Sequence, residues 1–111
     1  MKLSYQEYGP ILVLTISGEF TAEDVGVFER AANERLGAGS RHVMIDCEHL
    51  EFIDSAGLES WLRVRDEVGQ QNGQVRLINP DVSISKILEI TRMDKSFEAL
   101  PSLEAAVRSV R

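Results

Sequence analysis

The sequence has no long apolar run and only one cysteine. No stretch approaches the ~18 consecutive apolar residues of a membrane-spanning helix. The opening residues, MKLSYQEYGP, lack the apolar segment of a secretory signal. The lone Cys47 cannot form an intrachain disulfide, which suits a reducing compartment. We therefore expect a cytoplasmic protein that does not insert into a membrane.

Clustered basic residues are also missing. The chain has 12 Lys and Arg residues against 18 Asp and Glu, for a net charge of −6. Nucleic-acid binding requires Lys and Arg in clusters that displace counterions from phosphates, and only the RVR run at 63–65 places two together. Aromatic residues, at 6%, leave little for stacking on bases. These features exclude a nucleic-acid partner and are compatible with a basic protein partner.

The motifs of common enzyme and metal sites are absent. Neither phosphate-cradling pattern, GxxxxGK[ST] or GxGxxG, occurs. Cys47 and His49 form a CxH pair without the second cysteine of a zinc site. Ser55 in IDSAG lacks the first glycine of the hydrolase GxSxG elbow, and both histidines, His42 and His49, precede it. We predict no catalytic residue, no metal and no cofactor, and we interpret both histidines as solvated residues of a strand end and a loop.

Apolar and β-branched runs predict four strands, at 3–8, 11–16, 42–46 and 75–78. Gly9-Pro10 marks a turn between the first two, which indicates an opening hairpin. Apolar residues at helical spacing predict four helices. The first follows a Thr21–Asp24 capping pair, and the second begins near Ser55. The third has Asn79 as its cap and Pro80 as its first helical residue, and the last begins at Ser102.

Strands that alternate with helices predict an α/β fold with right-handed crossovers. We expect a single domain over residues 1–111. It should contain a mixed, mostly parallel sheet of four to five strands, with the N-terminal hairpin at one edge and helices packed against it. Sites in such folds usually lie at the carboxyl ends of the strands, and Ser55 lies beyond the strand at 42–46, across the short segment CEHLEFID.

Ser55 has two interpretations. A serine before a helix can cap orphan backbone N–H groups, but Asp54 alone could do so. The next pair, Ala56-Gly57, lowers helix propensity, leaves the hydroxyl sterically open and lets another backbone approach closely. An open hydroxyl at a helix N-terminus is also well placed to carry a phosphate, because the helix dipole favours an anion there.

The run FIDSAGL (52–58) resembles the phosphorylation motif of STAS domains, specifically of the anti-sigma factor antagonists. LVLTISGEF (12–20), NGQVRLINPDVSISKILEITRMDKSFE (72–98) and SLEAAV (102–107) are similar to further segments of that family, in the same order. The resemblance therefore covers nearly the whole chain. Thr21, Glu59 and Arg92 are departures, since relatives often carry Asp, Gly and Gly there.

This resemblance implies a partner switch. The unmodified protein would bind an anti-sigma factor serine kinase and so release a sigma factor. The kinase, with its own ATP and Mg²⁺, would phosphorylate Ser55 to end binding, and a phosphatase would reset the switch. The residues implied in partner binding are Asp54, Ala56, Gly57, Leu58, Glu59, Thr21 and Asp24. An alternative is a non-switching docking subunit of a lipid-transport complex or signalling scaffold. The oligomeric state is left open.

Overall fold

A ten-residue strand, β2 (Ile11–Phe20), organises the sheet of this protein, whose computed structural model describes residues 1–110. β2 pairs antiparallel with β1 (Lys2–Tyr8) across the Gly9-Pro10 turn. Its first half pairs parallel with β3 (His42–Asp46), and its second half pairs parallel with β4 (Leu50–Ile53). The change of neighbour occurs at Gly18, which has a φ of +82° and lies at a register shift.

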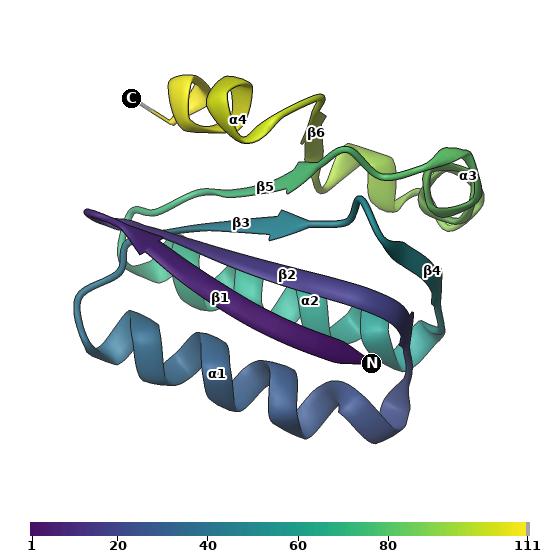
Figure 1. Cartoon of the computed structure of the whole chain (residues 1–111), viewed down its shortest axis with the longest axis horizontal. Helices are drawn as coiled ribbons and strands as arrows, with labels where there is room; N and C mark the ends of the chain where they lie inside the picture. The colour runs from purple at the N-terminus through teal and green to yellow at the C-terminus, as the bar shows by residue number, and fades with distance from the viewer. Residues whose placement is uncertain (111) are drawn as a thin grey trace.

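The rest of the sheet continues beyond β3. β5 (Val75–Ile78) pairs parallel with β3, and β6 (Glu98–Leu100) pairs parallel with β5, so the main path runs β1-β2-β3-β5-β6 (Figure 1). The helices are α1 (Val25–Gly37), α2 (Ser55–Gln70), α3 (Val82–Ile90) and α4 (Leu103–Ser109). Short 3₁₀ turns occupy Ala22–Asp24 and Met93–Lys95.

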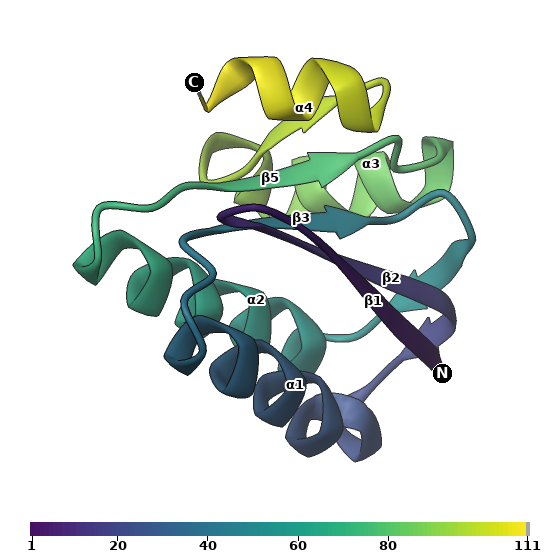
Figure 2. The ribbon, with the colours of Figure 1, turned by 60° about the vertical axis from the view of Figure 1, so that its left-hand side comes forward.

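Strand alternation divides the core between the two faces of the sheet. Leu12, Leu14 and Ile16 of β2 belong to the larger cluster, which also contains buried residues of α1, α2 and α3. Ile11 and Val13 point the other way and join a smaller cluster with Ala106 of α4. Figure 2 shows α1 and α2 on one side of the sheet and α4 on the other. The fully buried Trp61 of α2 lies in the larger core, as its helical spacing predicts.

The predicted α/β fold with an N-terminal hairpin is confirmed, but the sheet has six strands rather than four to five. β4 and β6 have only four and three residues, and neither shows simple alternation of buried and exposed positions.

The predicted N-cap of the third helix is wrong. Asp81, not Asn79, is the N-cap, because its Oδ1 accepts the Ile84 N–H at 2.8 Å, while Asn79 adopts a left-handed φ of +49°.

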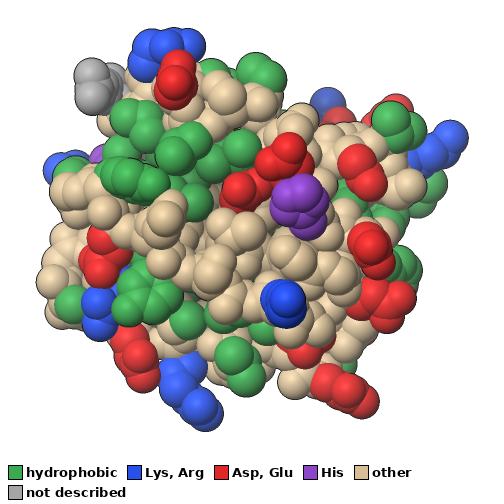
Figure 3. Space-filling model, in the orientation of Figure 1, with side chains coloured by type: hydrophobic (Ala, Val, Ile, Leu, Met, Phe, Trp, Pro, Cys, Tyr) green, Lys and Arg blue, Asp and Glu red, His purple; other side chains and the backbone are tan. Residues whose placement is uncertain are grey.

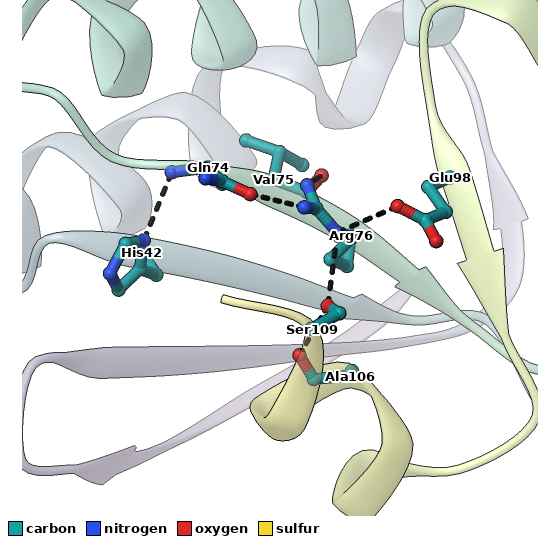
Figure 4. A network of polar contacts seen from close by, with 7 residues as sticks. All are labelled: His42, Gln74, Val75, Arg76, Glu98, Ala106 and Ser109. Atoms are coloured by element: carbon teal, nitrogen blue, oxygen red, sulfur yellow. Dashed lines mark hydrogen bonds and ion pairs between the residues drawn. The ribbon is translucent and has the colours of Figure 1, made fainter. Parts of the chain in front are cut away.

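A polar network joins β3, β5, β6 and α4 (Figure 4). Arg76 donates to Ser109 Oγ at 3.1 Å and to the Gln74 side chain, and it pairs with Glu98 at 3.2 Å. His42 Nδ1 accepts the Gln74 N–H at 3.0 Å. Burial, with the positive charges of Arg41 and Arg76, lowers the pKa of His42. The interpretation of His42 as simply solvated is therefore wrong, because the ring carries a backbone hydrogen bond.

Within residues 1–110, no helix is both long enough and apolar enough to cross a membrane.

Candidate functional site

Asp54 connects two elements at the carboxyl edge of the sheet. Its Oδ1 accepts the Gly57 N–H at 2.8 Å and so caps α2, as expected for an aspartate before a helix. Its Oδ2 accepts the Ala22 N–H at 3.1 Å, at the start of the 3₁₀ turn that follows β2. The Asp54 N–H in turn donates to the Phe20 carbonyl at 3.2 Å. The carboxylate therefore holds the start of α2 against the end of β2.

Ser55 is the first residue of α2, and its side chain is exposed. Only Asp54 separates it from the carboxyl end of β4, a strand not predicted from the sequence. Glu59, one turn further along, is also exposed, and Ala56 is half-buried. The Ser55 hydroxyl is thus accessible at the positive end of a 16-residue helix.

The two residues after Ala56 point into the protein. A Cβ on Gly57 would lie 2.7 Å from Ile53 Cγ1 and 3.0 Å from the Phe20 carbonyl oxygen, so only glycine fits without a shift. The close backbone approach inferred from Ala56-Gly57 therefore occurs within the chain itself. Leu58 is 4% exposed and packs in the larger core. The prediction that its side chain presents a contact surface is wrong, because the apolar face of α2 turns toward the sheet.

Thr21 and Asp24 form the capping pair that the sequence predicts at the start of the turn before α1. Asp24 Oδ2 accepts the Thr21 N–H at 3.1 Å and lies 3.4 Å from the Thr21 hydroxyl. Both residues are half-buried. They lie beside the Ala22 N–H that Asp54 binds, so the same short segment contributes to the platform around Ser55.

The loops and strand ends at the carboxyl edge of the sheet have acidic side chains and no basic ones, although the N-terminal ammonium group lies 4.0 Å from Asp24 Oδ1. Segments 19–24, 46–59 and 79–81 contain no Lys or Arg. Their acidic residues are Glu19, Glu23, Asp24, Asp46, Glu48, Glu51, Asp54, Glu59 and Asp81. A phosphate on Ser55 would therefore find no Lys or Arg in these segments with which to pair.

Phe52 is a surface residue that the sequence reasoning missed. It lies on β4, three residues before Ser55, and is 44% exposed, whereas its neighbour Ile53 is buried. Neighbouring residues of a strand point to opposite faces, so Phe52 faces away from the core when Ile53 is buried in it. The sequence could have shown this only if the short strand β4 had been predicted. Phe52 therefore leaves a large apolar side chain exposed on the strand that leads into α2.

An ion pair fixes α2 against α1. Arg63 donates from Nε and Nη2 to the two carboxylate oxygens of Glu29, at 2.9 and 3.1 Å. The hydrogen bond from Arg63 lowers the pKa of the Glu29 carboxyl and keeps it ionised. The helix that presents Ser55 is therefore held from its side as well as at its capped end.

Reactive groups are not gathered at this edge. Burial raises the pKa of the Cys47 thiol, with the Asp46 charge adding to the effect, so the thiol stays protonated. Among the described residues, no group of three or more His, Cys, Asp or Glu side chains is arranged to hold a metal ion. The arrangement presents an accessible hydroxyl at an edge of the sheet whose charged side chains are acidic.

The sequence of this chain is similar to those of known proteins. The family model described as STAS domain matches residues 2–106. A STAS-domain containing protein of Pseudomonas aeruginosa is 32% identical over 92 residues, covering 81% of this chain and 88% of that protein. BtrV of Bordetella bronchiseptica, provisionally named an anti-sigma factor antagonist, is 25% identical over 111 residues, covering 100% and 96%.

The fold is shared with solved structures. The unphosphorylated form of the anti-sigma factor antagonist SpoIIAA superposes with a TM-score of 0.84 at 19% identity, covering 99% of both chains. The phosphorylated form of SpoIIAA, a Bacillus cell fate determinant, gives a TM-score of 0.77 at 19% identity, covering 99% of this chain and 100% of that one.

Proposed function

The chain belongs to the STAS domain family, and we propose that it acts there as an anti-sigma factor antagonist switched at Ser55. In its unmodified form it binds an anti-sigma factor serine kinase in the cytoplasm, and so releases a sigma factor. The kinase supplies ATP and Mg²⁺ and phosphorylates Ser55, and a phosphatase reverses the modification. The chain itself is a substrate and a binding partner, and it performs no catalysis.

The observation that carries this proposal is the exposed Ser55 hydroxyl on the first residue of α2, with no Lys or Arg in the adjoining segments. A kinase must reach its acceptor hydroxyl, and this one lies beside a half-buried alanine at a helix end. The helix dipole tolerates an anion at this position, so the folded domain accommodates the phosphate. The relatives named as anti-sigma factor antagonists support the assignment of partner class.

Phosphorylation then acts at the interface rather than on the fold. The phosphate adds about −1.5 to −2 charges to an edge that is already acidic. A bound partner that covers Ser55 must desolvate this charge, and the adjoining segments contain no Lys or Arg side chain to compensate for it. A penalty of roughly 3–4 kcal/mol corresponds to a loss of affinity of a few hundred-fold.

The exposed residues around Ser55 supply the contact surface in this proposal. Glu59 and Phe52 are exposed and Ala56 is half-buried, so all three can contact a partner. Asp54 and the Thr21–Asp24 pair position this surface through their hydrogen bonds to backbone N–H groups. Gly57 and Leu58 support it from below.

Intact-mass spectrometry tests the proposal directly. The full chain is incubated with a candidate anti-sigma factor kinase, ATP and Mg²⁺, beside Ser55→Ala and Ser83→Ala variants. Ser83 is a matched control, because it is an exposed serine in the first turn of α3, another helix capped by an aspartate. We expect one phosphate on wild type and on Ser83→Ala, and none on Ser55→Ala.

Binding of the same kinase is then measured before and after phosphorylation. The expected result is a loss of affinity of roughly a hundred-fold or more. Binding without phosphate transfer, or equal affinity of both forms, would contradict the switch. Either result would favour a constitutive docking subunit.

A further inference from the structure

The sheet has one long edge without a partner strand in the described chain. β1 ends the sheet on one side, and the three-residue β6 ends its main path on the other. β1 pairs with β2 in one unbroken register from Lys2 to Tyr8, with no proline and no bulge. A long, regular edge strand presents a row of N–H and C=O groups that can pair with another strand. Figures 1 and 2 both draw β1 at the front of the sheet.

The hairpin determines which backbone groups point outward. The two-residue turn makes its flanking residues, Tyr8 and Ile11, a hydrogen-bonded pair. Such pairs alternate along an antiparallel ladder, so the even-numbered residues of β1 direct their backbone groups to β2. The N–H and C=O groups of Leu3, Tyr5 and Glu7 consequently face solvent.

We propose that β1 is a self-association surface, on which a second copy of this chain pairs its own β1 antiparallel about a two-fold axis through Tyr5. This register places Tyr5 opposite Tyr5, Leu3 opposite Glu7 and Lys2 opposite Tyr8 of the second copy. It pairs all seven residues of the strand and matches outward-facing backbone groups with each other. The two-fold axis is perpendicular to the sheet, so the face of each copy that carries α1 lies on the same side of the joined sheet.

On the face toward α1, the side chains are already ordered for pairing. The Arg35 guanidinium lies 5.4 Å from the Tyr5 ring centroid and donates to Glu7 Oε1 at 2.9 Å. Ser40 Oγ donates to the other Glu7 oxygen at 3.1 Å. Tyr5 is 51% exposed, and two such rings facing each other at the axis would bury the large aromatic surface that the monomer leaves in water.

On the opposite face, an exposed aromatic ring beside a largely apolar hollow favours the same register. Tyr8, which is 47% exposed, lines a hollow of about 440 Å³ with Leu103, Val107, Glu104 and Arg108. Hydrophobic side chains gather in this region, between α4 and the hairpin (Figure 3). Lys2 of the second copy, opposite Tyr8, would lie with its aliphatic stem over the Tyr8 ring and its ammonium group in solvent. A second copy therefore fits both faces of the edge.

Cysteine cross-linking tests the register in the full-length chain. Cα atoms of a hydrogen-bonded antiparallel pair lie ~5.5 Å apart, within disulfide range, so Tyr5→Cys should cross-link to itself upon mild oxidation. Tyr8→Cys is the matched control, an exposed tyrosine on the same strand whose two copies would lie ~20 Å apart. The native Cys47 is buried and does not interfere. We expect a band of doubled mass for Tyr5→Cys and a monomer band for Tyr8→Cys.

Sedimentation velocity of the wild type supplies the independent measurement. We expect the mean mass of the wild type to rise toward twice the chain mass as the protein concentration increases. Tyr5→Lys places two cations opposite each other at the axis, so this variant should show no such rise. Mixing the Tyr5→Lys and Tyr5→Glu variants should restore the rise in mass, because opposite charges then meet at the axis. Circular dichroism verifies that each variant is folded. A single-chain mass up to millimolar concentration would overturn the proposal. Dimers without Tyr5→Cys cross-linking, or equal cross-linking of the two cysteine variants, would overturn it as well.

Discussion

Asp54 and Ala22 are 32 positions apart in the chain, yet the Asp54 Oδ2 accepts the Ala22 N–H at 3.1 Å. The other oxygen of the same carboxylate caps α2 through the Gly57 N–H. One side chain thus fixes the helix that presents Ser55 to the end of β2. An aspartate in this position has a role in the architecture that is separate from any contact with a partner.

Replacing Asp54 should therefore cost more than removal of an ordinary cap. We expect Asp54→Ala to lower the free energy of unfolding by about 2 kcal/mol, and Asp81→Ala, which removes only the α3 cap, by about 1 kcal/mol. Asp54→Asn should fall between wild type and alanine, because its single amide oxygen can satisfy one of the two N–H groups. Urea unfolding measures all three values. Equal losses for Asp54→Ala and Asp81→Ala would contradict the bridging role.

Gly57 should resist even a methyl group. In Gly57→Ala the new Cβ meets Ile53 at 2.7 Å and the Phe20 carbonyl at 3.0 Å, and this clash should outweigh the gain in helix propensity. We expect a net destabilisation of about 1–3 kcal/mol. Gly69→Ala is the control in the same helix, with no atom within 4 Å of the added Cβ, and should stabilise by about 0.4–1 kcal/mol. Thermal and urea unfolding of the two variants should change in opposite directions.

Arg92 occupies a backbone conformation that suits glycine. Its φ of +62° and ψ of 18° lie in the left-handed region, where a side chain is strained. We expect Arg92→Gly to raise the free energy of unfolding by about 0.5–1 kcal/mol, the relief of strain being partly offset by the freedom that glycine gains in the unfolded chain. Arg92→Ala removes the same charged side chain but keeps the strain, so an equal gain in that variant would contradict the explanation. Urea denaturation compares the two.

His42 should make stability depend on pH. Burial, Arg41 and Arg76 hold its folded pKa below the ordinary value of 6.5, so the unfolded chain binds the proton more tightly. The contribution of neutral His42 to the free energy of unfolding is therefore fully present above pH 6.5. It is lost as the pH falls from that value through the folded pKa, because protonation removes the acceptor for the Gln74 N–H.

The pH dependence is measured by urea unfolding between neutral pH and about pH 5, above the range in which most carboxylates titrate. His42→Gln lacks the titrating group, so its stability should fall less over this window than that of the wild type. An NMR titration of the His42 ring should place its midpoint below 6.5. Identical pH slopes for the two proteins would show that His42 makes no contribution.

Several features were determined by the sequence alone because they depend on local chemistry. Strand-forming runs, the Gly9-Pro10 turn, the Thr21–Asp24 pair and the start of α2 at Ser55 all follow from short-range preferences, and the structure has each of them. The alternation of strands and helices similarly predicts the α/β fold. The exclusion of a long apolar span also needs only the order of residues.

Tertiary structure decided the features that depend on contacts between distant segments. β4 and β6 exist because β2 and β5 supply partners for runs too short to identify by pattern. Gly57 and Leu58 look like surface residues when read beside Ser55, yet the packing of α2 against Phe20 and Ile53 buries them. The bond from Asp54 to Ala22 likewise arises only when β2 and β4 pair side by side. Residues adjacent in sequence thus have different roles, because the fold turns one face of α2 to solvent and the other to the core.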